Sequence, residues 1–109
     1  MNTFITEKYV KELLTNMGFD FSLIGTLYLK EALMIVVKQP KSLLSINTTV
    51  LEDIAFKNNN TVKNIESDIK WTIMKAYEKG DIKDFSYLPY NKVPTTKQMI
   101  VCLFDFIMD

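Results

Sequence analysis

Apolar residues recur every three or four positions along most of this chain, and this spacing constrains the fold more than any other feature. The clearest case is Ile65, Ile69 and Ile73, which follow one another at steps of four residues. Residues four apart lie on the same side of an α-helix, whereas a half-buried strand would need strict alternation. The pattern therefore predicts an all-α fold of about six helices, forming a single domain over residues 1–109.

Capping residues and helix breakers predict where these helices begin and end. Thr95 with glutamine three residues later matches a capping box, and Thr61 is expected to cap the helix before it. Pro40, the run Asn58–Asn60 and Gly80 are expected to end helices. The expected helices are 3–17, 22–38, 49–57, 61–79 and 95–108, with a short helix or turn at 42–46 and a packed loop at 81–94.

The basic and sulfur-containing residues exclude several kinds of active site. All 13 basic residues are lysines, and the chain has no histidine. Histidine acid–base catalysis, histidine metal ligation and a Ser–His–Asp triad are therefore excluded, as is the bidentate arginine fork. One cysteine, Cys102, makes neither an internal disulfide nor a metal cluster, and the isolated glycines form no phosphate-binding loop. We expect no enzymatic activity, no cofactor and no metal.

The charge balance and the ends of the chain bear on partners and compartment. The 13 acidic residues balance the 13 lysines, so no overall positive charge attracts nucleic acid or an anionic membrane. Unbroken apolar runs such as Ala32–Val37 are too short to span a bilayer, and the N-terminus lacks the apolar core of a signal peptide. A lone cysteine fits a reducing compartment. We therefore expect a cytoplasmic protein with no membrane partner.

The segment 49–79 has the spacing of a helix–turn–helix, in which a helix, a short polar turn and a second helix follow one another. In DNA-binding proteins the second helix of this motif enters the major groove. The spacing alone is weak support, because many all-α domains contain two helices joined by a polar turn. The charge of the segment adds modest support, because five lysines face three acids between Lys57 and Lys79.

The outward face of helix 61–79, opposite its isoleucine stripe, carries the residues expected to bind double-stranded DNA. Its lysines would hold phosphates as point charges, and its short polar side chains and tryptophan would touch base edges. The residues that start the helix would offer backbone N–H groups to a phosphate. The predicted DNA-binding residues are Asn60, Thr61, Lys63, Asn64, Glu66, Ser67, Lys70, Trp71 and Lys75.

Several segments resemble one known family, the DNA-binding effector domain of the stage zero sporulation response regulator. Gly25–Leu33 is similar to the family helix G-x-x-Y-L-[RK]-E-A-[IL]. Ser45–Ala55 resembles S-I-x-x-V-L-x-P-D-I-A, although Glu52 stands where the proline is usual. Ile65–Ile73 is similar to the V-E-x-x-I-x-x-x-I core of the recognition helix, and Pro94–Thr95 resembles the opening of the final helix.

The resemblance implies an all-helical domain with a helix–turn–helix that binds a short DNA box, often as a tandem pair. Such domains control transcription at the onset of sporulation. The family's full-length member carries a receiver domain that is phosphorylated, whereas Met1 lies only about one helix before the region of resemblance. We therefore expect a stand-alone effector domain whose pairing, as a homodimer or a tandem pair on DNA, uses helix 95–108.

The family's recognition helix presents arginines and a histidine, and this chain departs from that pattern. At the matching positions stand Asn64, Ser67 and Trp71, while Lys70 keeps a positive charge and Glu66 keeps the acid. Two hypotheses follow. Either the protein reads a different DNA sequence, or it has lost base readout and modulates a related regulator by dimerising through helix 95–108.

Overall fold

All regular structure in the described residues, 5–79 and 92–109 of this computed structural model, is helical. The five α-helices are α1 (Glu7–Asn16), α2 (Ile24–Lys38), α3 (Glu52–Lys57), α4 (Val62–Glu78) and α5 (Thr96–Met108). A 3₁₀ helix, η1 (Pro40–Ser45), and a π-helical segment, η2 (Ile46–Leu51), lie between α2 and α3. The all-α prediction is confirmed, but the six expected helices are five α-helices in the described part of the chain.

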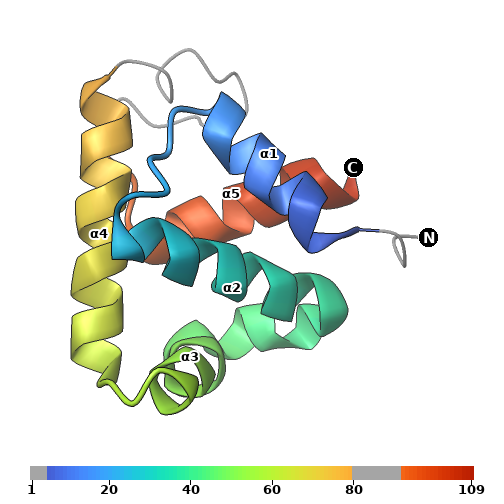
Figure 1. Cartoon of the computed structure of the whole chain (residues 1–109). Coiled ribbons are helices and arrows are strands. Elements are labelled where there is room, and N and C mark those ends of the chain that lie inside the picture. The colour runs from blue at the N-terminus through green and yellow to red at the C-terminus, as the bar shows by residue number, and fades with distance from the viewer. Residues whose placement is uncertain (1–4, 80–91) are drawn as a thin grey trace.

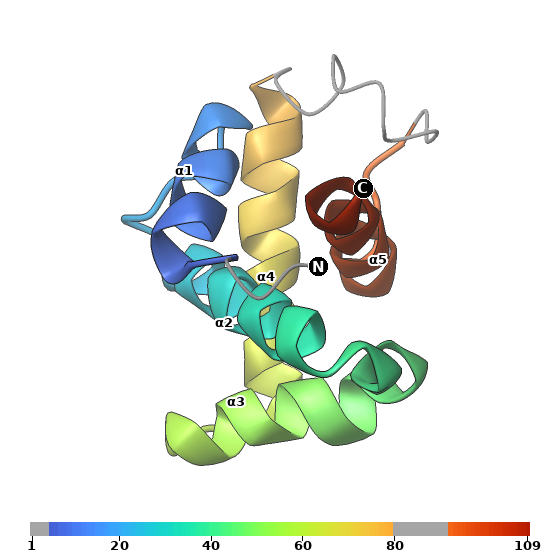
Figure 2. The ribbon, with the colours of Figure 1, turned by 90° about the vertical axis from the view of Figure 1, so that its right-hand side faces the viewer.

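The helix α2 lies at the centre of the fold and packs against every other α-helix (Figure 1). Leu29, Ala32, Leu33 and Val36 are completely buried along it, as expected of a helix that is apolar on nearly all sides. α4 runs along one edge of the molecule and crosses α2, and in Figure 2 α1 and α5 lie to either side of α4. Within residues 5–79 and 92–109, no helix combines the length and apolar character needed to cross a membrane.

Two helices begin later than predicted, because polar residues near their starts form local hydrogen bonds instead. α1 begins at Glu7 and not near residue 3, since the Thr6 hydroxyl accepts a hydrogen bond from the Tyr9 N–H at 3.1 Å and caps the helix. α2 begins at Ile24 and not at Ser22, whose N–H and hydroxyl both donate to the Asp20 carboxylate. This donation by Ser22 lowers the pKa of Asp20 and keeps Ser22 in the preceding turn.

The helix predicted at 49–57 is longer than expected, and its first part is not α-helical. The chain turns helically from Ile46 through η2 and continues into α3 at Glu52. The short helix or turn predicted at 42–46 is η1, which begins at Pro40 because proline is well suited to a first helical position. Pro40 thus follows the end of α2, as predicted, and also opens the next helical segment.

The capping box of α5 forms as the sequence predicts. The Thr95 hydroxyl accepts from the Gln98 N–H at 3.1 Å, and the Gln98 side chain accepts from the Thr95 N–H at 3.0 Å. Met99, Ile100 and Leu103 are buried where α5 packs on α2 and α4. This apolar helix therefore docks on the core with part of its surface. Gly80 and most of the predicted loop 81–94 lie outside the described residues.

The first residue of α5 suggests a stabilising substitution. Thr96 is only 3% exposed, and its buried hydroxyl has no hydrogen-bond partner in the part of the chain that the structure describes. Valine has the same shape without the desolvated hydroxyl, so Thr96→Val is expected to raise stability by about 1 kcal/mol and the melting temperature by roughly 4–8 °C. The matched control is Thr95→Val, which removes the cap and should lower stability by about 1 kcal/mol. Thermal unfolding followed by circular dichroism measures both, and a lower melting temperature for Thr96→Val would contradict the argument.

Candidate nucleic-acid interface

The turn between α3 and α4 is built from the three consecutive asparagines. Asn59 adopts a left-handed backbone conformation, with φ of 51°, which asparagine tolerates better than most residues. The Asn58 side chain donates to the Ile54 carbonyl at 2.7 Å, and the Asn60 N–H donates to the Ala55 carbonyl at 2.9 Å. These bonds satisfy the last carbonyls of α3 and set the direction in which α4 leaves the turn.

The helix α4 has one buried face and one outward face, as the isoleucine stripe predicts. Its N-terminus is capped by Thr61, whose hydroxyl accepts from the Asn64 N–H at 3.1 Å. The side chains that face the core are Ile65, Ile69, Thr72, Ile73 and Ala76. The opposite face is open along the length of the helix, and it lies on the outside of the molecule in Figure 1.

All nine residues predicted to bind DNA lie on α4 or on the two residues before it. Seven of them are exposed, namely Thr61, Lys63, Asn64, Ser67, Lys70, Trp71 and Lys75. The other two, Asn60 and Glu66, are half-buried, Asn60 in the turn and Glu66 on the flank that faces the start of α5. The structure therefore brings the predicted residues together on one helix surface.

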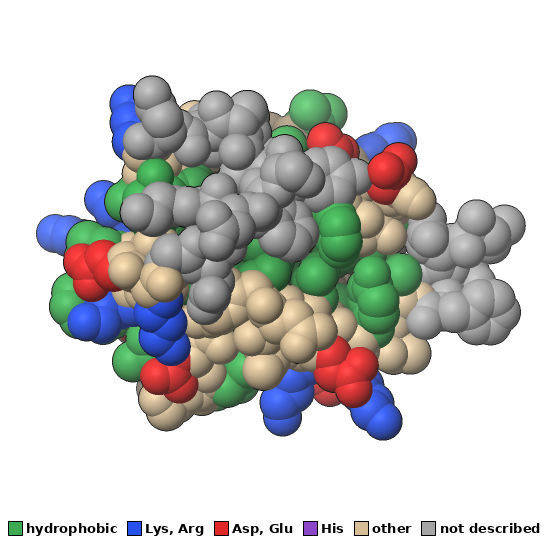
Figure 3. All heavy atoms as spheres, turned by 90° about the horizontal axis from the view of Figure 1, so that it is seen from above, with side chains coloured by type: hydrophobic (Ala, Val, Ile, Leu, Met, Phe, Trp, Pro, Cys, Tyr) green, Lys and Arg blue, Asp and Glu red, His purple; other side chains and the backbone are tan. Residues whose placement is uncertain are grey.

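The three lysines of α4 are balanced by three acidic residues, but the lysines differ in how free they are to bind a phosphate. Lys75 lies 5.1 Å from the centre of the Trp71 ring and 3.9 Å from the Glu78 carboxylate, so two neighbours compete for its charge. Lys63 and Lys70 are exposed and form no ion pair with any described residue. On the face seen in Figure 3, lysines and acids are interspersed around the margin, and the described residues form no continuous patch of one sign.

A hollow lies beside the outward face of α4, against the segment that leads into α5. Ser67, Lys70 and Trp71 line it from α4, and Val93 and Pro94 line it from the other side. Trp71 is 49% exposed, so its ring is divided between this hollow and solvent. The exposed part of the Trp71 ring can therefore contact a partner, as the predicted surface role requires. Lys75, one turn further along α4, lies next to the ring.

A close junction between α2 and α4 fixes where the outward face points, and the sequence did not reveal it. A Cβ atom added at Gly25 would overlap the backbone carbonyl of Asp68, so only glycine permits this approach of the two helices. Next to it, the buried Thr26 hydroxyl donates to the Asp20 carbonyl at 2.6 Å and therefore accepts from the Thr72 hydroxyl. A glycine inside an otherwise helical pattern was the available signal, because glycine weakens a helix unless packing requires it.

The family-like motif of α2 also contacts the turn before α4. The Asn58 side chain donates to the Glu31 carboxylate at 3.3 Å, and the Asn60 side chain approaches the Tyr28 hydroxyl at 3.5 Å. Tyr28 is 6% exposed, and its ring lies in the core. The motif thus supports the helix–turn–helix from behind, because its glycine, tyrosine and glutamate all contact α4 or the preceding turn.

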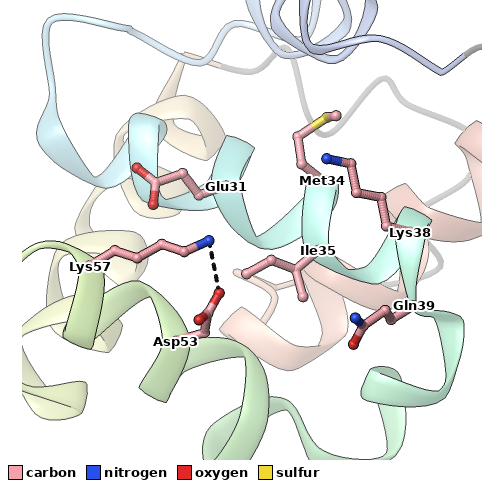
Figure 4. Close-up of a pocket in the computed structure, with 7 residues that line it drawn as sticks. All are labelled: Glu31, Met34, Ile35, Lys38, Gln39, Asp53 and Lys57. Carbon is pink, nitrogen blue, oxygen red and sulfur yellow. Dashed lines mark ion pairs between the residues drawn. The ribbon is translucent and has the colours of Figure 1, made fainter.

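A groove between α2 and α3 contains charges of both signs (Figure 4). Lys57 and Asp53, one turn apart on α3, form an ion pair at 3.1 Å on the α3 side of the groove. Met34 and Ile35 contribute apolar side chains from α2. The groove contains none of the predicted DNA-binding residues. Lys57, one of the five lysines counted between Lys57 and Lys79, has Asp53 as its partner there. The described residues hold no group of three or more histidine, cysteine or carboxylate side chains that could bind a metal.

Comparison with protein families agrees with the resemblance seen in the sequence. The family model described as "Sporulation initiation factor Spo0A C terminal" matches residues 10–106, which is nearly the whole chain. The matched region begins in α1 and ends in α5, so it includes the junction of α2 with α4 and the complete helix–turn–helix. The chain therefore belongs to the family of C-terminal, DNA-binding effector domains of the sporulation initiation regulator.

Proposed function

We propose that residues 1–109 act as one sequence-specific DNA-binding domain that regulates transcription in the cytoplasm, with α4 as its recognition helix. The observation that carries this proposal is the open outward face of α4. It presents Lys63 and Lys70, which form no ion pair with any described residue, beside the polar side chains of Asn64 and Ser67. Membership of a DNA-binding family supports the proposal. Because the chain has no arginine, it cannot form the bidentate arginine contact with guanine. We therefore expect its DNA site to differ from that of relatives that carry arginines.

Each part of the outward face has its own role in this proposal. Asn64, Ser67 and Trp71 follow one another at three- and four-residue steps, so all three can face one groove. Lys63 and Lys70 lie together toward one flank and would contact phosphates. Glu66 would accept a hydrogen bond from a cytosine amino group, as carboxylates do in the major groove. The backbone N–H groups of Asn60 and Thr61, expected to meet a phosphate, donate instead to the Ala55 carbonyl and to the Asn60 side chain. Thr61 would therefore meet a phosphate through its hydroxyl hydrogen, and Lys75 would add a further charge.

Selection from random duplexes tests this function. The full chain is incubated with a randomised duplex pool, the bound fraction is amplified through several rounds, and the enriched duplex is measured by gel shift at two salt concentrations. We expect one enriched sequence whose affinity falls as salt rises, because phosphate binding releases counterions. No binding to any duplex at low salt would contradict the proposed function.

Two alanine variants separate phosphate binding from base readout. Lys70→Ala is expected to weaken binding to all duplexes alike and to reduce the salt slope by about 1, because one phosphate contact is lost. Asn64→Ala is expected to relax the base preference at one position, which a bidentate contact would otherwise favour by about 1–3 kcal/mol. Gel shifts with the enriched duplex and its single-base variants measure both effects. Equal loss of specificity in the two variants would contradict these roles.

Pairing through α5 is the second proposal, and it does not require DNA readout. Val101, Phe104 and Met108 are only partly buried on this helix, so a second copy or a related regulator can cover them. Sedimentation of the protein alone, with the enriched duplex and with a related full-length regulator tests this proposal. A monomer under all three conditions would contradict it.

A further inference from the structure

Asn60 and Asn64 are linked by a hydrogen bond at the start of the recognition helix. The Asn60 side-chain oxygen accepts from the Thr61 N–H at 2.8 Å and from the Asn64 Nδ2 at 3.0 Å. The Asn60 backbone N–H is held by the Ala55 carbonyl. Because both the backbone and the side chain of Asn60 have partners, its oxygen occupies a defined position relative to α4.

The position of the Asn60 oxygen determines which way round the Asn64 carboxamide lies. If this carboxamide were flipped, its own oxygen would face the oxygen of Asn60, and two acceptors would meet without a proton. Asn64 therefore directs its nitrogen toward Asn60 and its oxygen away. One N–H of Asn64 is used by Asn60, which leaves one N–H and the carbonyl oxygen available, and this donor–acceptor pair is what a bidentate contact with adenine requires.

The buried Tyr28 supports this arrangement from the core. Its hydroxyl lies 3.5 Å from the Asn60 Nδ2, a longer contact than those that Asn60 makes with Thr61 and Asn64. Because the ring is held in the core by α2, its hydroxyl is a rigid reference point for the turn. The order of contacts thus runs from the core to the surface, from Tyr28 to Asn60 to Asn64.

We propose that Asn60 is a positioning residue that orients Asn64 to recognise adenine at one position of the DNA site, with Tyr28 as its support. This inference rests on the proposed DNA-binding function and assigns Asn60 a role other than phosphate binding. It also predicts which base that position of the site carries. Asn60 itself touches no base in this arrangement.

A double-mutant cycle measured on single-base variants of the enriched duplex tests the inference. The wild-type protein is expected to prefer adenine at one position by roughly 5- to 150-fold. Asn60→Ala should reduce that preference to about twofold or less, at the same position that Asn64→Ala affects. The double variant should lose no more of the adenine preference than Asn64→Ala alone, because Asn60 acts through Asn64. Tyr28→Phe should produce a smaller loss at that position.

Asn16→Ala is the matched control, because it removes the same side chain from an exposed position at the end of α1, outside the helix–turn–helix, and leaves the pair of Asn60 and Asn64 intact. It should leave every base preference unchanged. An Asn60→Ala variant that keeps the adenine preference, or that binds more weakly without any change in preference, would overturn the positioning role while leaving the proposed function in place. Failure of the wild-type protein to bind any duplex would overturn both.

Discussion

Replacing Gly25 with alanine is expected to lower the free energy of unfolding by about 3 kcal/mol or more. Alanine would improve the helix propensity of α2 by about 1 kcal/mol, but its methyl group would overlap the backbone carbonyl of Asp68. A backbone carbonyl inside α4 cannot rotate away as a side chain can, so the two helices must separate. That separation would also strain the buried hydrogen bond between Thr26 and Thr72.

Urea unfolding followed by circular dichroism measures this effect. The control is Ile24→Ala at the preceding position, because Ile24 is 49% exposed and its loss should change stability little. A Gly25→Ala variant as stable as the wild-type protein would contradict the close junction. An increase of stability would mean that helix propensity outweighs packing at this position.

Reversing two charges on α4 is expected to have the largest effect on DNA affinity. Lys63→Glu with Lys70→Glu replaces two exposed cations of the outward face with carboxylates that repel phosphate. We expect affinity for the enriched duplex to fall by roughly 100-fold or more at low salt, and the difference to shrink as salt screens the charges. Gel shifts at several salt concentrations measure this change.

The matched control reverses two exposed lysines of α1, Lys8 and Lys11. Both double variants change the net charge of the chain from 0 to −4, because each lysine-to-glutamate change subtracts two charges. α1 lies on a different side of the molecule from the outward face of α4 (Figure 1). Equal losses of DNA affinity in the two double variants would show that affinity depends on the overall charge of the chain and not on the lysines of α4.

The sequence predicted the helices well wherever apolar spacing and capping agree. The isoleucine stripe specifies the buried face of α4, and the capping box of Thr95 specifies the start of α5. Each signal lies within a short stretch of sequence, so both features can be predicted without knowing the tertiary contacts. The starts expected near residue 3, at Ser22 and at Thr49 were wrong, because several polar residues competed to end or cap a helix there. Hydrogen bonds such as that of Ser22 to Asp20 decided the outcome.

The surface of the candidate site could be predicted, whereas its supporting contacts could not. Removing the buried stripe from a helix leaves its outward face, which is why Lys63, Ser67 and Lys70 emerged from the sequence alone. The approach of Gly25 to Asp68 joins residues more than 40 positions apart and depends on how α2 crosses α4. The orientation of Asn64 likewise depends on the left-handed turn that places Asn60 beside it.

The fluorescence of Trp71 tests the central claim, that the outward face of α4 binds DNA, most directly. Trp71 is the only tryptophan of the chain, and it is half exposed on that face, so its emission reports on this surface alone. Titration with the enriched duplex is expected to change the emission with saturation, at the concentrations that shift the gel, and added salt should reverse the change. Binding in the gel with unchanged Trp71 emission would place DNA elsewhere on the molecule and contradict the claim.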